Sequence, residues 1–194
     1  MKISKVSFVK SFALGTPLNE FDLPEIAVAG KSNVGKSSFI NFLTGARIAK
    51  TSKEPGRTRL INYFSVNGGQ FHLVDLPGYG YAEVSDSEKE KWGKLMDEYF
   101  RTGKHIKNVF ILIDIRRIPS SDDLQMADYL LYYHIPYTII CTKCDKVSKA
   151  EAQRCKKTIA NAFKIGVDSL LVTSSEKQIG KEEVLQKIEN ILNV

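Results

Sequence analysis

Residues 25–44 read EIAVAGKSNVGKSSFINFLT, and this stretch decides the fold. A short apolar run, residues 25–29, enters a glycine-rich turn, GKSNVGKS at residues 30–37, and residues 38–44 then show helical apolar spacing. A strand, a glycine-rich loop and a helix in this order form a phosphate-binding loop, in which backbone N–H groups and the helix N-terminus face phosphate oxygens. The stretch therefore predicts a nucleotide-binding α/β domain.

The polar positions of this loop have distinct expected roles. Gly30 and Gly35 let the backbone bend toward the phosphates. Lys36 reaches the β and γ phosphates, and Ser37 supplies a hydroxyl for Mg²⁺. We expect all eight residues to contact the nucleotide: Gly30, Lys31, Ser32, Asn33, Val34, Gly35, Lys36 and Ser37.

Composition limits the class of protein. The chain has 194 residues, 43% of them hydrophobic and 26% charged, which is typical of one globular domain spanning residues 1–194. No apolar run approaches the ~20 residues that span a bilayer, and residues 1–15 lack the uninterrupted apolar segment of a signal peptide. We therefore expect a cytoplasmic protein without a membrane partner. The net charge of +6 is compatible with an anionic partner, although it identifies none.

The three cysteines leave one alternative open. An odd number argues against a disulfide framework, but Cys141 and Cys144 form a CxxC pair. A zinc or redox site built on this pair would need further ligands, and Cys155 and the histidines are scattered along the sequence. The simpler interpretation is that Cys141 ends a buried strand.

Apolar runs alternate with amphipathic stretches along the whole chain. The expected strands are residues 5–12, 25–29, 62–66, 70–74, 108–113, 136–141 and 169–172, and the expected helices are residues 38–44, 87–101, 121–133, 148–164 and 180–192. Asn67-Gly68-Gly69 predicts a hairpin, so the two strands that it joins should be antiparallel. The pattern predicts an α/β fold: a three-layer α/β/α sandwich with a mostly parallel sheet of the six-stranded type and one antiparallel hairpin strand, preceded by a short N-terminal strand extension at residues 1–23.

A second motif follows the strand that ends at Val74. The sequence is Asp75-Leu76-Pro77-Gly78, and an aspartate at the carboxyl end of a strand beside a phosphate loop can hold Mg²⁺. The N–H of Gly78 can approach the γ phosphate. The alternative is a plain Asp-Pro-Gly turn, because the four-residue pattern alone is common.

A third motif points to the base of the nucleotide. Thr142-Lys143-Cys144-Asp145 follows an apolar strand, and the Asp145 carboxylate can accept hydrogen bonds from the N1–H and 2-amino donors of guanine. Adenine lacks this pair of donors. Backbone N–H groups of Thr173, Ser174 and Ser175 can approach the guanine O6. The alternatives are a polar loop without this role and a P-loop kinase that phosphorylates a small molecule.

The order and spacing of these motifs resemble those of the translation-factor-like bacterial GTPases. GKSNVGKSSFIN, PGRTRLINYF, DLPGYGYA, DIRRIPSSDD and TKCD look like the EngB family of small GTPases, and the resemblance covers nearly the whole chain. It implies a P-loop NTPase of the G-domain type that binds GTP and GDP with Mg²⁺ and hydrolyses GTP. It further implies a role in assembly of the large ribosomal subunit, through the subunit or its rRNA, with consequences for cell division and septum formation. Nothing indicates DNA binding or demands a dimer, so we expect a monomer.

The same resemblance assigns a role to the segment before the third strand. It implies that Thr58 is the threonine whose hydroxyl joins Ser37 and Asp75 on Mg²⁺ when GTP is bound. Such a segment would be ordered by the γ phosphate and the metal. The expected contacts in this segment are Gly56, Arg57, Thr58, Arg59 and Leu60. The alternative is that Thr58 only begins the strand.

Three positions bear on the rate of hydrolysis. Thr142 stands where related GTPases usually have asparagine, which suggests modest nucleotide affinity. Tyr79 stands where Ras-like GTPases have a glutamine that orients the attacking water, so intrinsic hydrolysis should be slow. Asn33 matches an asparagine that helps some related GTPases bind K⁺ beside the phosphates. The expected catalytic residues are Lys36, Thr58, Gly78 and Asn33. A nucleotide-loaded scaffold that never hydrolyses GTP in its working cycle stays as the other possibility.

Overall fold

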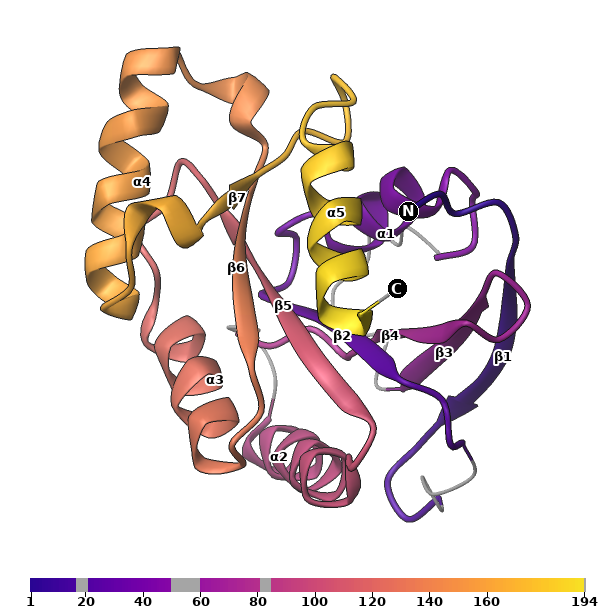
Figure 1. Cartoon of the computed structure of the whole chain (residues 1–194). Helices are drawn as coiled ribbons and strands as arrows, with labels where there is room; N and C mark the ends of the chain where they lie inside the picture. Colours follow the sequence, from indigo (N-terminus) through magenta and orange to yellow (C-terminus); the bar gives the residue numbers. More distant parts are fainter. Residues whose placement is uncertain (17–20, 50–59, 81–84, 194) are drawn as a thin grey trace.

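The computed structural model describes residues 1–16, 21–49, 60–80 and 85–193. Within them, seven strands form one sheet in the order β1-β3-β4-β2-β5-β6-β7 (Figure 1). Their bounds are β1 (Val6–Phe12), β2 (Glu25–Gly30), β3 (Ile61–Val66), β4 (Phe71–Asp75), β5 (Ile106–Asp114), β6 (Tyr137–Thr142) and β7 (Leu171–Val172).

The sheet consists of the predicted six-stranded type of sheet and the N-terminal strand that the sequence also predicts. The N-terminal strand β1 pairs antiparallel with β3, and β3 pairs antiparallel with β4 across the expected hairpin. All the other neighbours are parallel. The extension at residues 1–23 therefore contributes the seventh strand, while the mostly parallel character and the antiparallel hairpin are confirmed.

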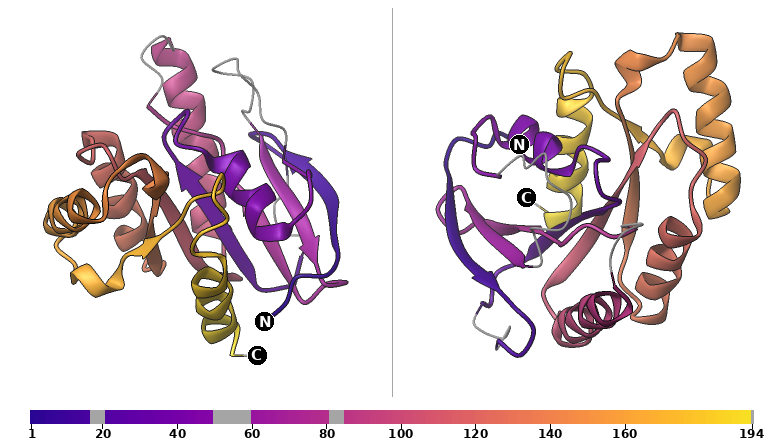
Figure 2. Two further views of the ribbon diagram at one scale, coloured as in Figure 1. Left: turned by 90° about the horizontal axis from the view of Figure 1, so that it is seen from above. Right: turned by 180° about the vertical axis from the view of Figure 1, so that it is seen from behind.

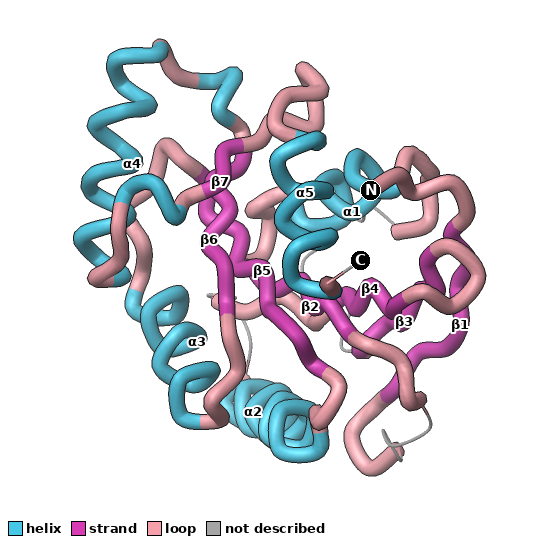
Figure 3. Tube along the Cα trace, viewed as in Figure 1, coloured by secondary structure: helices cyan, strands magenta, loops and turns pink. Residues whose placement is uncertain are grey.

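Helices cover both faces of the sheet, and Figures 2 and 3 show the strands as the middle layer. The helices are α1 (Lys36–Thr44), α2 (Asp86–Thr102), α3 (Ser121–Tyr132), α4 (Lys149–Phe163) and α5 (Lys181–Leu192). Apolar side chains of α2, α3 and α4 share one core cluster with the sheet, and those of α1 and α5 share a second. The predicted three-layer α/β/α sandwich is confirmed. No helix in the described part of the chain is long and apolar enough to cross a bilayer.

The last predicted strand is shorter than expected. The sequence predicts strand at residues 169–172, but Val167–Ser169 form the short 3₁₀ helix η2, and only two residues extend into β7. The N–H of Ser169 donates to the carbonyl of Gly166 at 3.0 Å, so the residues up to Ser169 are part of a helical turn and the strand begins only after it. The apolar run alone does not show where the turn ends.

The parallel strands β2, β4, β5 and β6 end at one edge of the sheet. Their registers align Val28 of β2 with Asp75 of β4, and Asp114 of β5 with Thr142 of β6. Ligands of open α/β sheets bind outside the carboxyl ends of the strands, because the connecting loops converge there. All three sequence motifs follow these strand ends, so the fold brings them to one place. The N-terminus lies elsewhere, with the amino group of Met1 2.9 Å from Oε2 of Glu189 on α5.

Candidate functional site

The phosphate loop depends on two close backbone approaches. A Cβ on Gly30 would lie 2.8 Å from Cγ1 of Val34 and 3.2 Å from Cβ of Leu112, so only glycine fits the end of β2. Gly35 has φ of 104°, a conformation that L side chains rarely adopt. The backbone of Gly30 therefore lies against the side chain of Val34, four residues later in the same loop, before α1 begins.

The N-terminus of α1 is open toward the loop. No described side chain caps it, and its first turn contains no acidic residue. The first N–H groups of a helix have no partner within the helix, and the helix dipole favours an anion beside them. The arrangement suits a phosphate group at this position.

A buried ion pair links this helix to β4. The amino group of Lys36, in the first turn of α1, contacts Oδ1 of Asp75, the last residue of β4. The Asp75 residue is only 4% exposed. A charge pair this deep lies in a medium of low effective dielectric, where each group interacts strongly with an added charge. Lys36 can therefore act on a phosphate oxygen, and Asp75 on a metal ion, at the same place.

The segment after Asp75 is bonded to the phosphate loop. The N–H of Leu76 donates to the carbonyl of Val28 at 3.1 Å, and the N–H of Ser32 donates to the carbonyl of Tyr79 at 2.9 Å. The indole N–H of Trp92 on α2 donates to the carbonyl of Pro77 at 3.2 Å. These bonds hold residues 75–79 between the loop and α2.

Tyr79 lies inside the protein. It is 6% exposed, its ring meets that of Trp92 edge-on, and its hydroxyl donates to Oδ1 of Asp123 on α3 at 2.9 Å. Burial, reinforced by the Asp123 carboxylate, raises the pKa of Tyr79 well above its usual value. The phenol is therefore a neutral structural donor. Sequence reasoning assigned no contact to Asp123 or Trp92, since the contacts join residues 44 and 15 positions apart.

The base motif is tied to the phosphate loop by two side chains. The hydroxyl of Thr142 donates to the carbonyl of Val34 at 3.0 Å. Lys143, at φ 61°, donates from Nζ to the carbonyl of Asn33 at 3.0 Å. Both bonds join segments more than 100 residues apart and hold the expected base site and phosphate site at one spacing.

Asp145 is positioned by a neighbouring loop. Ser174, itself 1% exposed, donates from Oγ to Oδ1 of Asp145 at 2.5 Å. This hydrogen bond, with a further contribution from Lys146, lowers the pKa of Asp145, so the carboxylate is ionised at neutral pH. Its Oδ2 lies 3.0 Å from Nζ of Lys146. Because each oxygen of an ionised carboxylate can accept more than one hydrogen bond, Asp145 suits the two N–H donors of guanine.

One charged residue of the site received no role from the sequence. Asp114 ends β5, is 4% exposed, and binds Arg116 at 2.7 Å and Lys143 at 3.0 Å. Burial opposes its ionisation, but the hydrogen bonds from Arg116 and Lys143 outweigh that effect and hold its pKa well below the usual range. Asp114 thereby positions Lys143. The sequence signal that could have identified Asp114 is a carboxylate at the carboxyl end of an apolar strand.

The structure gathers most of the expected residues. Residues 30–37, 75–78, 142–145 and 173–175 all lie at the carboxyl edge of the sheet. The side chain of Lys31 lies 3.5 Å from Asp122 on α3, so its expected contact would come from its backbone. Gly56, Arg57, Thr58 and Arg59 lie outside the described residues, and Leu60 stands just before β3, 38% exposed.

The two cysteines of the CxxC pair differ in how deeply they are buried. Cys141 is fully buried in β6, and this burial raises the pKa of its thiol to about 12. Cys144 is only partly buried and packs against the same core cluster. Among the described residues, no group of three or more His, Cys, Asp or Glu side chains is placed to hold a metal ion, so the pair lacks the further ligands that a zinc site would need. Cys141 is thus a core residue of its strand, as the simpler interpretation predicts.

Comparisons with known proteins give the family. Residues 25–143 match the family model described as 50S ribosome-binding GTPase. The chain is 42% identical over 195 residues to the probable GTP-binding protein EngB of Bacillus subtilis, covering 100% of both chains. It is 47% identical over 171 residues to the protein of the same name from Lactococcus lactis subsp. lactis, covering 87% of each.

Solved structures support the same fold. A crystal structure of a probable GTP-binding protein EngB superposes with a TM-score of 0.72 at 23% identity, covering 87% of this chain and 98% of that one. Era of Aquifex aeolicus bound to GDP and AlF4⁻ gives 0.68 at 20% identity, covering 86% of this chain and 56% of Era. The family model and the relatives above 40% identity decide between the alternatives of kinase, redox protein and GTPase: the chain belongs to the EngB family of GTP-binding proteins and is a GTPase.

Proposed function

We propose that this GTPase is a slow, Mg²⁺-dependent switch that acts in assembly of the large ribosomal subunit. It works in the cytoplasm as a single-domain monomer spanning residues 1–194, and normal cell division and septum formation depend on it. The description of the family model as 50S ribosome-binding supports the choice of subunit. The net charge of +6 is compatible with contact to rRNA.

The contact between Ser32 and Tyr79 carries the switch part of this proposal. The N–H of Ser32, within the phosphate loop, bonds at 2.9 Å to the carbonyl of Tyr79, directly after Gly78. A γ phosphate that draws the Gly78 N–H toward itself would pull on this bond. Movement would then pass to Tyr79 and through its hydroxyl to Asp123 on α3. The state of the nucleotide would thus reach a helix surface outside the site.

The residues present fit a magnesium ion. Ser37 and Asp75 would hold it, with Thr58 as a third ligand from the segment outside the described residues. Hydroxyl and carboxylate oxygens are the ligands that Mg²⁺ prefers, and Asp75 already lies beside the phosphate-binding Lys36. When bound, the ion would offset the negative charge of the phosphates.

Hydrolysis would be slow because no side chain is assigned to orient the attacking water. Tyr79 occupies that sequence position, but its phenol is buried against Asp123. Lys36 and the Gly78 N–H would stabilise the charge that develops on the γ phosphate. Asn33 has an exposed side chain and a positive φ of 63°, and we propose that it helps bind K⁺ there. Equal turnover in KCl and NaCl would remove this potassium role.

Phosphate release with and without ribosomal subunits tests the proposal. We expect purified large subunits to accelerate GTP hydrolysis by at least about tenfold, and small subunits at the same concentration to leave it unchanged. The Lys36→Ala variant controls for contaminating GTPases, since Lys36 is the expected phosphate ligand. Equal rates with large, small or no subunits would contradict a role on the large subunit and favour a scaffold that does not hydrolyse GTP in its working cycle.

A further inference from the structure

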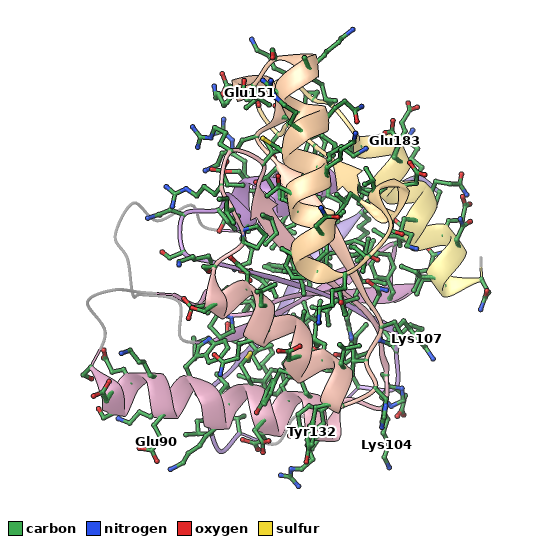
Figure 4. The ribbon with its side chains drawn as sticks, turned by 90° about the vertical axis from the view of Figure 1, so that its left-hand side faces the viewer. Glu90, Lys104, Lys107, Tyr132, Glu151 and Glu183 are labelled. Carbon is green, nitrogen blue, oxygen red and sulfur yellow. The ribbon has the colours of Figure 1, made fainter. Side chains whose placement is uncertain are left out.

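The outer face of α4 carries an unusual set of charges. Lys149, Arg154, Lys157 and Lys164, the last directly after the helix, are exposed, and we call these four residues the α4 basic face. None of them forms an ion pair with another described residue. Figure 4 shows α4 standing on the side of the molecule turned to the viewer, away from α1 and α5.

The acid on this helix is engaged elsewhere. Glu151 forms a capping box with Ser148: its N–H donates to Ser148 Oγ at 3.2 Å and its carboxylate accepts from the Ser148 N–H. It serves the helix N-terminus rather than the neighbouring cations. The unpaired charge is therefore not balanced along α4.

The cations of helix α2 are paired, in contrast to those of α4. Its Lys89, Lys94 and Arg101 each pair with an acid three or four residues earlier on the same helix, at 3.1, 2.7 and 3.9 Å. Such pairs are the ordinary arrangement of a solvated helix surface. On α4 the positions three and four residues before Lys157 and Lys164 hold no acid, and Glu151, three residues before Arg154, is used in the capping box, so these cations remain available to an external partner.

Three of the four basic side chains share one side of the helix. At about 100° per residue, Arg154, Lys157 and Lys164 fall within an arc of about 80°, opposite the buried Ile159 and Phe163, and Lys149 lies about 60° beyond Lys164. The short side chains of Ala150 and Asn161 lie in the same arc and leave the cations prominent. From residue 149 to residue 164 the helix rises about 22 Å, a length that spans several phosphates of a nucleic acid backbone.

We propose that the α4 basic face binds the phosphate backbone of double-helical RNA in the large ribosomal subunit. This inference rests on the proposed function and names the surface that performs it. Charge complementarity favours a polyanion. The exposed large hydrophobic residues of the described chain all lie outside α4, so the helix lacks the apolar face that a membrane surface would require. It also presents no exposed aromatic ring on which unpaired bases could stack, which favours a duplex over a single strand.

The position of the helix places this RNA beside the base site. Asp145 and the N-cap Ser148 are three residues apart, joined by the short 3₁₀ helix η1 (Cys144–Lys146). RNA docked along α4 would therefore lie next to the guanine-binding loop.

Two charge-reversal variants test the surface. R154E/K157E reverses two exposed cations on α4, and K104E/K107E reverses two exposed lysines at the far end of the molecule, where Figure 4 labels both. The net charge changes equally in the two variants. The probes are a 20-base-pair RNA duplex and purified large subunits, with GDP binding and thermal unfolding as checks of folding.

For R154E/K157E we expect the affinity for the duplex at 0.1 M salt to fall at least about thirtyfold, because each lost phosphate contact changes the salt slope of log K by about 0.7 to 0.9. The slope itself should decrease by about 1.5. Affinity for large subunits should fall in parallel, GDP binding should be unchanged, and K104E/K107E should behave like the wild type.

The outcomes separate this inference from the proposed function. If the wild type binds subunits and R154E/K157E binds them equally well, the surface is wrong while the proposed function stands. Loss of subunit binding with unchanged duplex binding would also overturn RNA as the partner and point to a ribosomal protein. Duplex binding that depends on α4 without any subunit binding would support the surface and contradict the proposed function. A wild type that binds neither probe would overturn both.

Discussion

The hydroxyl of Thr142 donates a 3.0 Å hydrogen bond to the carbonyl of Val34, and so joins the strand that carries the guanine box to the phosphate loop. Thr142 is 5% exposed and Val34 is equally buried, so water does not compete for this bond. The threonine that replaces the usual asparagine thus supplies one donor at the point where the loop needs it. Compared with asparagine, Thr142 lacks only a second hydrogen-bonding group on its side chain.

Replacing Thr142 by valine should loosen the phosphate loop. The variant keeps the shape but leaves the buried carbonyl of Val34 without its donor, which costs about 1 to 3 kcal/mol. We expect the free energy of unfolding to fall by about this amount and GDP affinity to fall about fivefold, measured by titration calorimetry. Thr142→Ser retains the hydroxyl and should bind GDP within about twofold of the wild type. Wild-type affinity in the valine variant would show that the bond does not position the loop.

Replacing Asp145 by asparagine should change the base preference. The amide offers one donor and one acceptor in place of two acceptors, so it no longer matches the two donors of guanine but matches the N1–H and 2-oxo groups of xanthine. We expect GDP affinity to fall about a hundredfold or more and XDP to bind more tightly than GDP. Asp168→Asn, at an exposed carboxylate of η2, is the matched control. An unchanged ratio of GDP to XDP affinity would remove Asp145 from the base site.

Replacing Tyr79 by phenylalanine should affect stability rather than chemistry. The change deletes the 2.9 Å bond to Asp123, whose other oxygen still accepts from Ser120, and should lower the free energy of unfolding by about 1 to 2 kcal/mol. Basal GTP hydrolysis without subunits should stay within about twofold of the wild type, because the buried phenol does not face the phosphates. A tenfold loss of basal turnover with intact GDP binding would place the hydroxyl in the reaction.

A buried carboxyl at the opposite end of β2 should make stability depend on pH. Glu25 is 4% exposed, and its Oε2 accepts from the hydroxyls of Tyr99 at 2.9 Å and Tyr63 at 3.4 Å. Burial raises its pKa from 4.5 to about 7, although the two tyrosine hydrogen bonds act in the other direction. The folded state therefore holds a proton that the unfolded state releases.

The direction in which stability changes with pH follows from this raised pKa. The contribution of Glu25 to stability is fully present below pH 4.5 and is lost as the pH rises through about 7, a total of about 3 kcal/mol at 1.36 kcal/mol per pKa unit. In Glu25→Gln this dependence should disappear. Urea denaturation at pH 5 and pH 8 measures it: the wild type should lose about 2 kcal/mol more than the variant between these values. Equal losses would mean that Glu25 ionises normally in the folded protein.

Local patterns in the sequence were sufficient to predict much of the fold. The strand, glycine turn and helix at residues 25–44 lie within 20 consecutive positions, and the asparagine-glycine turn at residues 67–69 directly specifies its hairpin. The N-terminal strand was predicted as well, but its partner was not. Pairing of β1 with β3 joins residues about 55 positions apart, and nothing in the alternation of residues 5–12 indicates which strand edge is available.

In the site, too, local features could be predicted and contacts between distant residues could not. Motif residues such as Lys36, Asp75 and Asp145 can be placed from their neighbours along the chain, because strand ends converge at one edge of the sheet. The residues that hold them in position could not be placed. Asp114 orients Lys143, Ser174 orients Asp145, and Asp123 receives the Tyr79 hydroxyl, each across 29 or more positions. Those contacts depend on three-dimensional packing that no local pattern contains.

The measurement that tests the central claim most directly is co-sedimentation of the protein with purified large ribosomal subunits in three conditions: a non-hydrolysable GTP analogue, GDP, and no nucleotide. It should be carried out at two salt concentrations, because electrostatic contacts to RNA weaken as salt rises. A switch that reports the γ phosphate through Ser32 and Tyr79 predicts binding at least about tenfold tighter with the analogue than with GDP, at both concentrations. Equal binding in all three conditions would contradict it.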